Sequence, residues 1–361
     1  MILGKNSGPG SDFFAFLCRV KIDALVEVFI QRVLGGDVMV LSEAVSKPGK
    51  KAGAAVLLHG GAWDIPEDRH ADHLDGLREA LAHARDILEK DGGAVDAAAA
   101  AVSSMESNGT FDAGRGGVLN LEGEVELDCG IMCGRSLDYG AVVGVRKILN
   151  PVRLARLILE KSDGSARILA CEGAERIAEE YGFPLVENSE LVCERERLRY
   201  EELRERKAAY HTSHPFLGSC ELPQGTVGCV ARDRSGALAA ATSTGGTPLR
   251  PPGRVGDSAL PGAGYYASTA AACSVTGWGE AITASLLAGR SVDGVGGGGA
   301  PADVLREVLE RMRTSVRNPD GKGATGGLII LDREGSGAWA FSTPHMARAG
   351  WAEGAEGWAA V

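Results

Sequence analysis

The sequence has no stripe of clustered lysine and arginine. Its 361 residues carry 48 acidic and 38 basic side chains, which give a net charge of −10. Because nucleic-acid backbones are bound by clustered basic groups, nucleic acid is not expected as a partner. The acidic excess favours solubility instead.

Paired cysteines are also missing, since no CxxC occurs among the eight cysteines. Several lie in apolar runs, as Cys229 does between Gly228 and Val230, where a free thiol acts as a small hydrophobe. Reduced thiols in a cytoplasmic protein are therefore expected, rather than a metal site or a disulfide framework. The positions are Cys18, Cys129, Cys133, Cys171, Cys193, Cys220, Cys229 and Cys273.

Within residues 1–52, the longest uncharged stretch is far shorter than the ~20 residues that a membrane-spanning helix needs. A helix is predicted from Phe13 to Leu34, with charged residues interrupting the apolar ones. Its basic residues lie within the apolar part rather than ahead of it, unlike those of a signal peptide. Residues 1–52 are interpreted either as an additional helical extension or as a stretch ahead of a natural start near Met39.

Glycine, in contrast, is abundant: 51 glycines are about twice the usual share. They alternate with apolar runs and so indicate tight turns rather than disorder. The globular pattern begins at Ala54. Residues 53–225 and 226–361 are interpreted as two parts of one folded domain, the second beginning at Thr226.

Strands and helices follow one another in blocks, which predicts an α+β fold with stacked sheets covered by helices. Helices are predicted over Arg69–Lys90, Ala94–Met105, Pro151–Lys161, Ala166–Tyr181, Ala281–Ala288 and Ala302–Arg313, and a charged, solvated one over Glu194–Ala209. Strands are predicted over Ala54–Leu58 and Ala141–Val145, and hairpins over 116–132, 226–244 and 327–342.

The segment Gln224–Gly228 is the strongest candidate for chemistry. Alone, its Gly-Thr pair is typical of a strand entry or a β-bulge. What favours a functional reading is the ordered set of polar, glycine-rich motifs that follows, at Thr242–Gly246, Pro252–Ser258, Gly262–Ala267 and Thr276–Glu280.

This set resembles the plant-type L-asparaginase and isoaspartyl peptidase family of the N-terminal nucleophile hydrolases. The resemblance covers about residues 54–350. It implies a four-layer αββα sandwich, hydrolysis of a β-aspartyl amide of a small-molecule substrate, and a homodimer of processed units. Earlier segments agree with the family's HGGA, FNAGxG, ELDA, GAVAGV and NPV motifs, at His59–Ala62, Phe111–Gly116, Glu126–Asp128, Gly140–Val145 and Asn150–Val152.

The resemblance implies that Thr226 is the nucleophile and that the chain cuts itself between Gly225 and Thr226. A threonine hydroxyl needs an adjacent base. The α-amine released by the cut lies on the same residue and has a reference pKa of ~7.7–8.0. Gly225 has no Cβ, so it tolerates a strained backbone beside the bond.

Thr244 matches the family threonine that hydrogen-bonds the nucleophile, although a strand threonine is equally explained by β-branching. Thr276 and Gly277 match the oxyanion hole of the family, where a hydroxyl and an N–H stabilise developing charge. Gly277 and Gly279 also leave room for substrate. The other interpretation of this stretch is an ordinary loop that enters a helix.

Arg254 and Asp257 are the candidate substrate-binding residues. A guanidinium binds a carboxylate through two parallel hydrogen bonds. A carboxylate three residues away binds an ammonium, so together they recognise a free amino-acid head group. The alternative is a salt bridge between the two side chains themselves.

Three residues depart from the family pattern. Asp112 replaces an asparagine near the oxyanion, and an ionised carboxylate cannot donate a hydrogen bond. Trp278 replaces a smaller residue and would narrow the pocket, and Cys133 replaces an aspartate. No GxSxG elbow occurs, so the HGG turn at His59 does not indicate a lipase.

The resemblance implies no cofactor for catalysis but a structural sodium. Two other functions stay open: a glycosylasparaginase-like activity, and an unprocessed, inactive homologue that serves as a binding protein. The preference between asparagine and isoaspartyl dipeptides also stays open. The sodium ligands would be the main-chain carbonyls of Met105, Glu106, Asn108, Phe111, Ala113 and Arg115.

Overall fold

The computed structural model describes residues 15–21, 27–33, 39–44, 53–206, 225–318 and 321–361. These residues form two sheets and a set of helices, so the α+β class predicted from the sequence is confirmed. The described strands pair antiparallel, apart from the pair of 141–143 with 168–170, which is parallel. This pattern fits blocks of strands and helices rather than repeated βαβ units.

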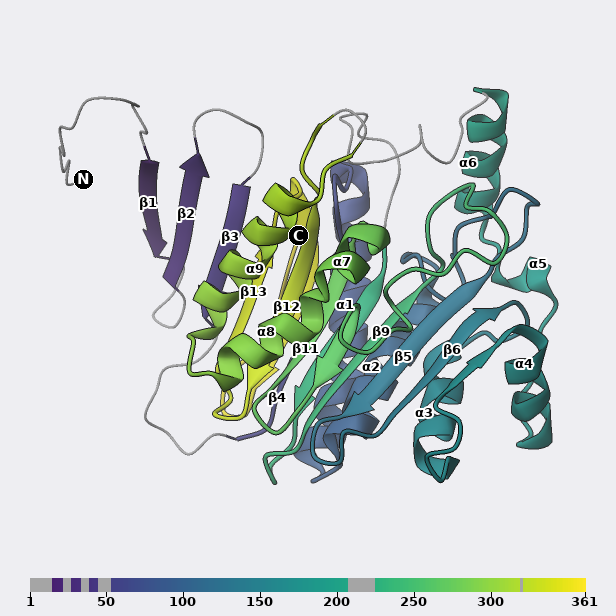
Figure 1. Cartoon of the computed structure of the whole chain (residues 1–361), viewed down its shortest axis with the longest axis horizontal. Coiled ribbons are helices and arrows are strands. Elements are labelled where there is room, and N and C mark those ends of the chain that lie inside the picture. Colours follow the sequence, from purple (N-terminus) through teal and green to yellow (C-terminus); the bar gives the residue numbers. More distant parts are fainter. Residues whose placement is uncertain (1–14, 22–26, 34–38, 45–52, 207–224, 319–320) are drawn as a thin grey trace.

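The first sheet has seven strands (Figure 1). In order across the sheet they are β1 (Ala15–Lys21), β2 (Glu27–Val33), β3 (Met39–Ala44), β13 (Gly337–Phe341), β12 (Gly326–Asp332), β11 (Ala271–Gly277) and β10 (Tyr265–Ala267).

The second sheet has eight strands, and its centre joins the two parts of the chain. In order across the sheet they are β15 (Trp358–Ala360), β14 (His345–Ala352), β4 (Ala55–Trp63), β8 (Val227–Arg232), β9 (Leu238–Thr244), β5 (Leu127–Cys133), β6 (Tyr139–Val145) and β7 (Ile168–Ala170). Strand β8 therefore lies between β4 and β9, in the middle of the sheet.

Helices cover the two sheets. A 3-10 turn, Glu67–Arg69, leads into α1 (His70–Glu89), which α2 (Ala94–Asn108) and α3 (Pro151–Lys161) follow. The shorter α4 (Cys171–Glu180), α5 (Asn188–Leu191) and α6 (Glu194–Glu205) come next, and α7 (Gly279–Ser285), α8 (Leu287–Gly296) and α9 (Pro301–Ser315) belong to the C-terminal part.

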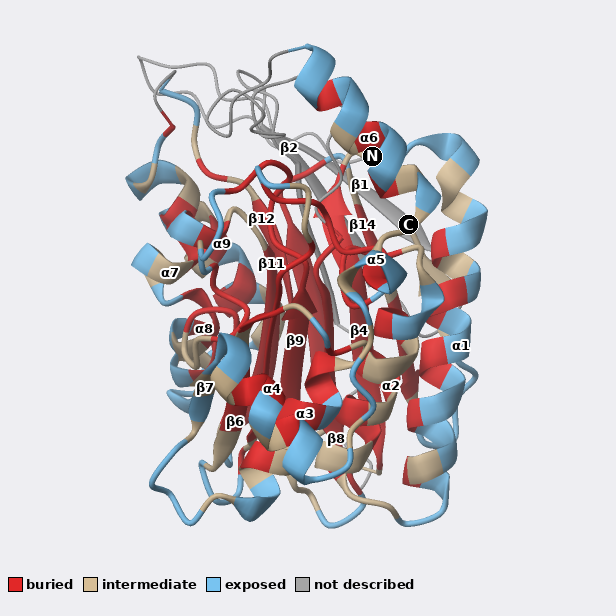
Figure 2. Cartoon of the chain, turned by 90° about the vertical axis from the view of Figure 1, so that its right-hand side faces the viewer, coloured by how far each residue is buried: buried red, intermediate tan, exposed pale blue. Residues whose placement is uncertain are grey.

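Three hydrophobic clusters hold these elements together. One joins α1, α2 and α3 to the eight-stranded sheet, through residues such as Leu77, Val102 and Ile158. A second joins α8 and α9 to the seven-stranded sheet, through residues such as Val292 and Leu305. The third lies between the two sheets and is built from β4, β8, β12 and β13. Figure 2 shows central strands such as β4, β9 and β11 in the buried colour and the outward helix faces exposed.

The N-terminal prediction is wrong: where a helix was expected from Phe13 to Leu34, β1 and β2 form a hairpin. Strand β2 pairs with β3, which pairs with β13. The edge of a sheet offers a row of unpaired N–H and C=O groups. Pairing with this edge satisfies the hydrogen-bonding groups of the N-terminal backbone, although the apolar spacing of the sequence had predicted a helix.

Two other predicted elements are also corrected. The expected helix Ala166–Tyr181 begins with β7 and becomes helical only at Cys171, because Ile168–Ala170 pair with β6 at the sheet edge. In the expected hairpin 116–132, only β5 is a strand. The Leu119–Val125 bridge stands alone because the Asn120 side chain accepts the N–H groups of the turn instead.

The charged helix and the expected helix 281–288 also differ in detail. Helix α6 ends at Glu205, and it buries Glu196, Arg199 and Leu203 rather than being solvated throughout. Residues 207–209 lie outside the described part of the chain. The second helix is divided at Leu286, whose φ of 49° separates α7 from α8.

The described cysteines are free thiols. Those at positions 129, 229 and 273 are buried, and burial raises the pKa of Cys273 to about 12. Cys171 is exposed, unlike the buried thiols that were expected. Cys220 and the side chain of Cys18 lie outside the described part.

No helix in the described part of the chain is long and apolar enough to cross a membrane.

Candidate functional site

Thr226 lies immediately before β8, at the end of the central strand pair. Because β8 and β9 are antiparallel and Val227 pairs with Ser243, the next position outward brings Thr226 beside Thr244. The two hydroxyl oxygens are 3.0 Å apart and both residues are buried. The structure thus brings the two candidate residues Thr226 and Thr244 into contact.

Thr244 is itself fixed by the backbone. The Gly246 N–H donates to the Thr244 Oγ1 at 3.0 Å. With this N–H as donor, the Thr244 oxygen keeps its own proton available for the Thr226 oxygen. The arrangement orients the Thr226 hydroxyl and would stabilise negative charge as it develops there.

Gly225 is pressed against the loop that carries Asp112. The Asp112 N–H donates to the Gly225 carbonyl oxygen at 3.1 Å. A Cβ at Gly225 would lie only 2.6 Å from that same nitrogen, so only glycine allows this approach. The carbonyl ahead of Thr226 is therefore already polarised by a hydrogen bond.

Asp112 contributes through its backbone rather than through its side chain. Its Oδ1 accepts the Val118 N–H at 3.0 Å, and its main-chain oxygen accepts the Gly245 N–H at 2.9 Å. Burial, followed by the nearby Glu196 carboxylate, raises the pKa of Asp112 to about 7. The replacement of asparagine by aspartate at this position changes the side chain. It therefore leaves the backbone N–H that contacts Gly225 unchanged.

A buried chain of polar groups lies behind Thr226. His59 contacts the Thr226 carbonyl oxygen through Nδ1 at 3.1 Å and the Ser274 Oγ through Nε2 at 2.8 Å. Burial lowers the pKa of His59 to about 3, so the ring is neutral. A carbonyl can only accept, so Nδ1 carries the proton and Nε2 accepts from Ser274. The Ser274 Oγ is in turn hydrogen-bonded to the Thr242 Oγ1 at 2.6 Å.

Thr276 and Gly277 end β11 at the same end of the stacked sheets as Thr226. A Cβ at Gly228 would meet Ser274, which places β8 over β11. Further along, a Cβ at Gly327 would meet Ala62, and Gly327 pairs with Thr276. Strand β4 runs antiparallel to β8 with His59 opposite Gly228, so Ala62 lies toward the end of β8 that follows Thr226. Thr276 therefore lies at the same end of the two sheets as Thr226.

The Thr276 hydroxyl is fully buried and has no hydrogen-bond partner among the described residues. Buried polar atoms are almost always paired, so an unpaired one is a candidate for ligand contact. The adjacent Gly277 has a φ of 136°, and a Cβ there would lie 2.5 Å from the Gly326 Cα. Glycine is therefore required at this turn.

Arg254 and Asp257 converge on Gly279. A Cβ at Gly279 would lie 2.7 Å from Arg254 Nη2 and 3.0 Å from Asp257 Oδ1, so the missing side chain leaves space between the two groups. Burial raises the pKa of Asp257 to about 7, although the Arg254 charge opposes the shift. Asp257 Oδ2 has no hydrogen-bond partner in the described structure.

Glu280 is the partner that sequence reasoning missed for Arg254. Its carboxylate accepts Arg254 Nε at 2.9 Å and Nη2 at 2.8 Å. Glu280 is half exposed, whereas Arg254 is nearly buried. The half-exposed Glu280 carboxylate thus holds the Arg254 guanidinium in place.

The other two departures from the family pattern are Trp278 and Cys133. Trp278 packs against the cluster between the helices and the seven-stranded sheet. Cys133 ends β5 opposite Ala239, whereas Thr244 pairs with Asp128 at the other end of that strand. Trp278 lies in the chain between the candidate residues Gly277 and Gly279, and its effect on the pocket stays a prediction.

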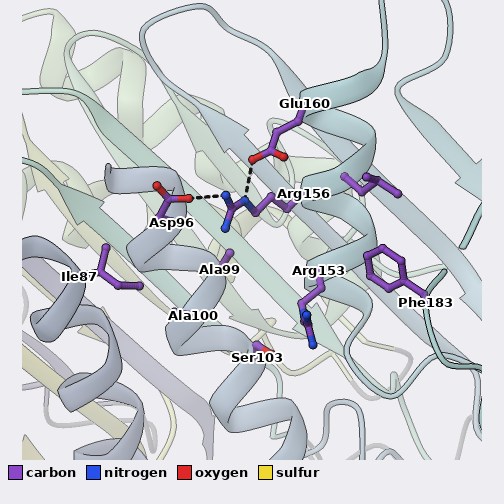
Figure 3. Close-up of a pocket in the computed structure, with 10 residues that line it drawn as sticks. Ile87, Asp96, Ala99, Ala100, Ser103, Arg153, Arg156, Glu160 and Phe183 are labelled. Atoms are coloured by element: carbon purple, nitrogen blue, oxygen red, sulfur yellow. Dashed lines mark hydrogen bonds and ion pairs between the residues drawn. The ribbon is translucent and has the colours of Figure 1, made fainter. Parts of the chain in front are cut away.

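A surface pocket of about 350 Å³ between α2 and α3 is a separate feature (Figure 3). Arg156 crosses it and pairs with Asp96 at 2.5 Å and with Glu160 at 2.8 Å. Together with Arg153, which also lines the pocket, these charges balance, and none of the candidate site residues lines it.

Within the described part of the chain, no group of three or more histidine, cysteine, aspartate or glutamate side chains is arranged to hold a metal ion. Around Thr226 the structure places the Thr244 hydroxyl beside the Thr226 hydroxyl, the His59 ring on the Thr226 carbonyl oxygen and the Asp112 N–H on the Gly225 carbonyl oxygen.

Comparison with known proteins agrees with this geometry. The model of the asparaginase family matches residues 52–360. An isoaspartyl peptidase/L-asparaginase of Danio rerio is 40% identical over 304 residues, covering 84% of this chain and 92% of that protein. The corresponding protein of Xenopus laevis is 39% identical over 292 residues, covering 81% and 90%. A plant-type L-asparaginase of Pyrococcus furiosus is 38% identical over 308 residues, covering 83% and 97%.

The chain therefore belongs to the asparaginase family, and the resemblance stated from its motifs is confirmed.

Sequence reasoning missed the chain formed by His59, Ser274 and Thr242 as a unit. The signal was present: Ser274 interrupts an apolar strand, and a polar residue buried in such a strand needs a partner.

Proposed function

We propose that this chain is a self-processing amidohydrolase that hydrolyses β-aspartyl amides through an acyl-threonine intermediate. Its substrates would be L-asparagine, isoaspartyl dipeptides or both. The observation that carries the proposal is the pairing of the Thr226 hydroxyl with Thr244, directly after a glycine whose carbonyl oxygen accepts a backbone N–H. The names of the relatives support this class of substrate.

The first step is cleavage of the chain. The Thr226 Oγ1 attacks the Gly225 carbonyl carbon, and the Asp112 N–H stabilises the oxyanion. The C–N bond breaks, the hydroxyl proton passes to the departing Thr226 nitrogen, and the acyl group is left on the Thr226 oxygen as an ester. Water then hydrolyses the ester, which leaves a carboxylate on Gly225 and a free α-amine on Thr226.

The same hydroxyl then acts on substrate. The α-amine takes the hydroxyl proton, since its reference pKa of ~7.7–8.0 leaves part of it neutral near pH 7. Thr226 attacks the amide carbon, and the leaving amine takes that proton. Water releases aspartate from the acyl-threonine. Thr276 and Gly277 would supply the oxyanion donors, typically worth ~10²–10³-fold each in rate.

Arg254 and Asp257 would bind the head group of the substrate. The guanidinium takes the α-carboxylate and Asp257 takes the α-ammonium. Asp257 Oδ2 has no partner in the described structure, as a group kept for a charged ligand would. Gly279 provides the space between them.

The remaining expectations stay part of this proposal. They are a four-layer αββα sandwich of the N-terminal nucleophile hydrolase type, a homodimer of processed units, a cytoplasmic location and no catalytic cofactor. A structural sodium fits the end of α2, where the last carbonyls lack helical partners and the dipole favours a cation. One of them, that of Glu106, accepts the Arg115 N–H at 2.7 Å.

The test compares three substrates with the purified protein: ammonia released from asparagine, aspartate released from an isoaspartyl dipeptide, and aspartate released from glycosylated asparagine. Activity on either of the first two supports the proposal. Activity on the third alone favours the glycosylasparaginase-like rival. An uncut chain inactive on all three would be a binding homologue.

A further inference from the structure

Helix α6 directs the partly buried guanidinium of Arg195 to the loop that carries Asp112. Arg195 Nη1 donates to the Thr110 carbonyl oxygen at 2.6 Å, and Nη2 donates to that of Gly116 at 3.4 Å. The arginine side chain is 20% exposed. A single planar group thus binds carbonyls on both sides of Asp112.

The guanidinium is itself oriented from α6. Arg195 Nε donates to Glu196 Oε1 at 2.7 Å, and Arg199 Nη1 donates to Glu196 Oε2 at 3.2 Å. Glu196 and Arg199 are both buried. Buried charges that lose a partner are costly, so these three side chains hold one another in a fixed geometry.

The loop that Arg195 binds contacts Gly225 and Gly245 through the backbone of Asp112. Its Asp112 N–H is the donor to the Gly225 carbonyl oxygen, and the Asp112 carbonyl accepts the Gly245 N–H. Gly225 approaches the Asp112 nitrogen closely enough that a Cβ would lie 2.6 Å from it. A small displacement of the loop would therefore remove the N–H from the position where the oxyanion forms.

We propose that Arg195 is a positioning residue for self-cleavage: its guanidinium ties Thr110 to Gly116 and so keeps the Asp112 N–H on the scissile carbonyl. This role rests on the proposed cleavage between Gly225 and Thr226. Arg195 touches no reacting atom. Its fork makes two carbonyl contacts at once, which a lysine cannot reproduce in full.

The test follows cleavage in time after cell-free synthesis of the full chain, read on a denaturing gel. Hydrogen bonds to a charged group are worth enough that Arg195→Ala should slow cleavage roughly 10- to 100-fold. Arg195→Lys should lie between this variant and the wild type. Arg197→Ala is the matched control on the same helix, since Arg197 is exposed and pairs only with Glu194 and Glu201 among the described residues.

Chemical rescue separates positioning from general loss of structure. Added methylguanidinium should restore cleavage of Arg195→Ala, while leaving Arg197→Ala and the wild type unaffected. The melting temperature of each variant is measured alongside.

If the wild type stays uncut, the proposed cleavage fails and the role of Arg195 falls with it. If the wild type is cut and Arg195→Ala is cut at the same rate, only the role of Arg195 is overturned. Slow cleavage with a lowered melting temperature and no rescue would mean that Arg195 merely stabilises the fold, which also overturns the proposal.

Discussion

Replacing Thr244 by valine tests the contact on which the chemistry depends. Valine keeps the branched shape but removes the oxygen that lies 3.0 Å from Thr226 Oγ1 and 3.0 Å from the Gly246 nitrogen. Two buried groups lose a partner at once, with no change in volume that would open a cavity.

The expected sizes follow from the two lost contacts. The Gly246 N–H is left without its acceptor, which costs about 1–3 kcal/mol of stability. The Thr226 oxygen gains negative charge as it attacks, so its bond to Thr244 counts as one to a charged group, worth about 1.5–3 kcal/mol. This corresponds to a roughly 10- to 150-fold slower attack.

The assay measures self-cleavage in time and urea unfolding of the same preparations. Thr244→Ser keeps the oxygen and should cleave at close to the wild-type rate. Thr314→Val is the matched control, because Thr314 is exposed and its hydroxyl, among the described residues, bonds to carbonyls of its own helix. Cleavage of Thr244→Val at the wild-type rate, with an unchanged unfolding midpoint, would refute the reasoning.

Three further outcomes are expected. Arg254→Ala and Asp257→Ala should each lower kcat/KM of the processed protein by about 10- to 150-fold without unfolding it. Each variant loses a charge-assisted contact to the substrate, worth ~1.5–3 kcal/mol. Unchanged kinetics in both variants would exclude the two residues from the substrate site. Burial keeps the pKa of His59 at about 3, whereas the unfolded imidazole binds a proton near 6.5, so acid favours the unfolded chain. Stability should therefore fall by at most ~1.4 kcal/mol per unit as the pH drops below 6.5, and this slope should shrink in His59→Gln, as measured by urea unfolding across pH. A chain that begins at Met39 keeps β3 on β13 and should fold, cut itself and hydrolyse substrate as the full chain does; loss of processing or of solubility would show that residues 1–38 are needed.

Much of the fold could be predicted because the spacing of apolar residues and the positions of proline and glycine act on local structure. The helix Pro151–Lys161 is found as predicted, since proline fits its first turn and the apolar face follows a helical period. The hairpin predicted over 226–244 is also found, with β8 beginning one residue later, at Val227, and β9 ending at Thr244.

What failed depends on contacts between distant segments. Where a helix was expected, Ala15–Lys21 and Glu27–Val33 form strands next to β3, which pairs with β13, about three hundred residues away along the chain. Helix α6 appeared solvated because its sequence is mostly charged, yet Arg195 and Glu196 face the loop that carries Asp112. No local pattern indicates which charges of such a helix are buried.

For the site, the motifs identified the residues but not their partners. Arg254 and Asp257 were found together, and the structure adds Glu280 as the carboxylate that holds the guanidinium. The aspartate at position 112 was judged by its side chain, whereas its backbone N–H makes the contact to Gly225. Side-chain identity carries no information about which backbone groups point into a site.

Intact-mass spectrometry of the purified protein, with Thr226→Ala beside it, tests the central claim most directly. The account predicts two fragments for the wild type, the second beginning at Thr226, and a single uncut chain for the variant. An intact wild-type chain, a cut at another position, or a Thr226→Ala chain still divided there would contradict the claim that Thr226 is the nucleophile.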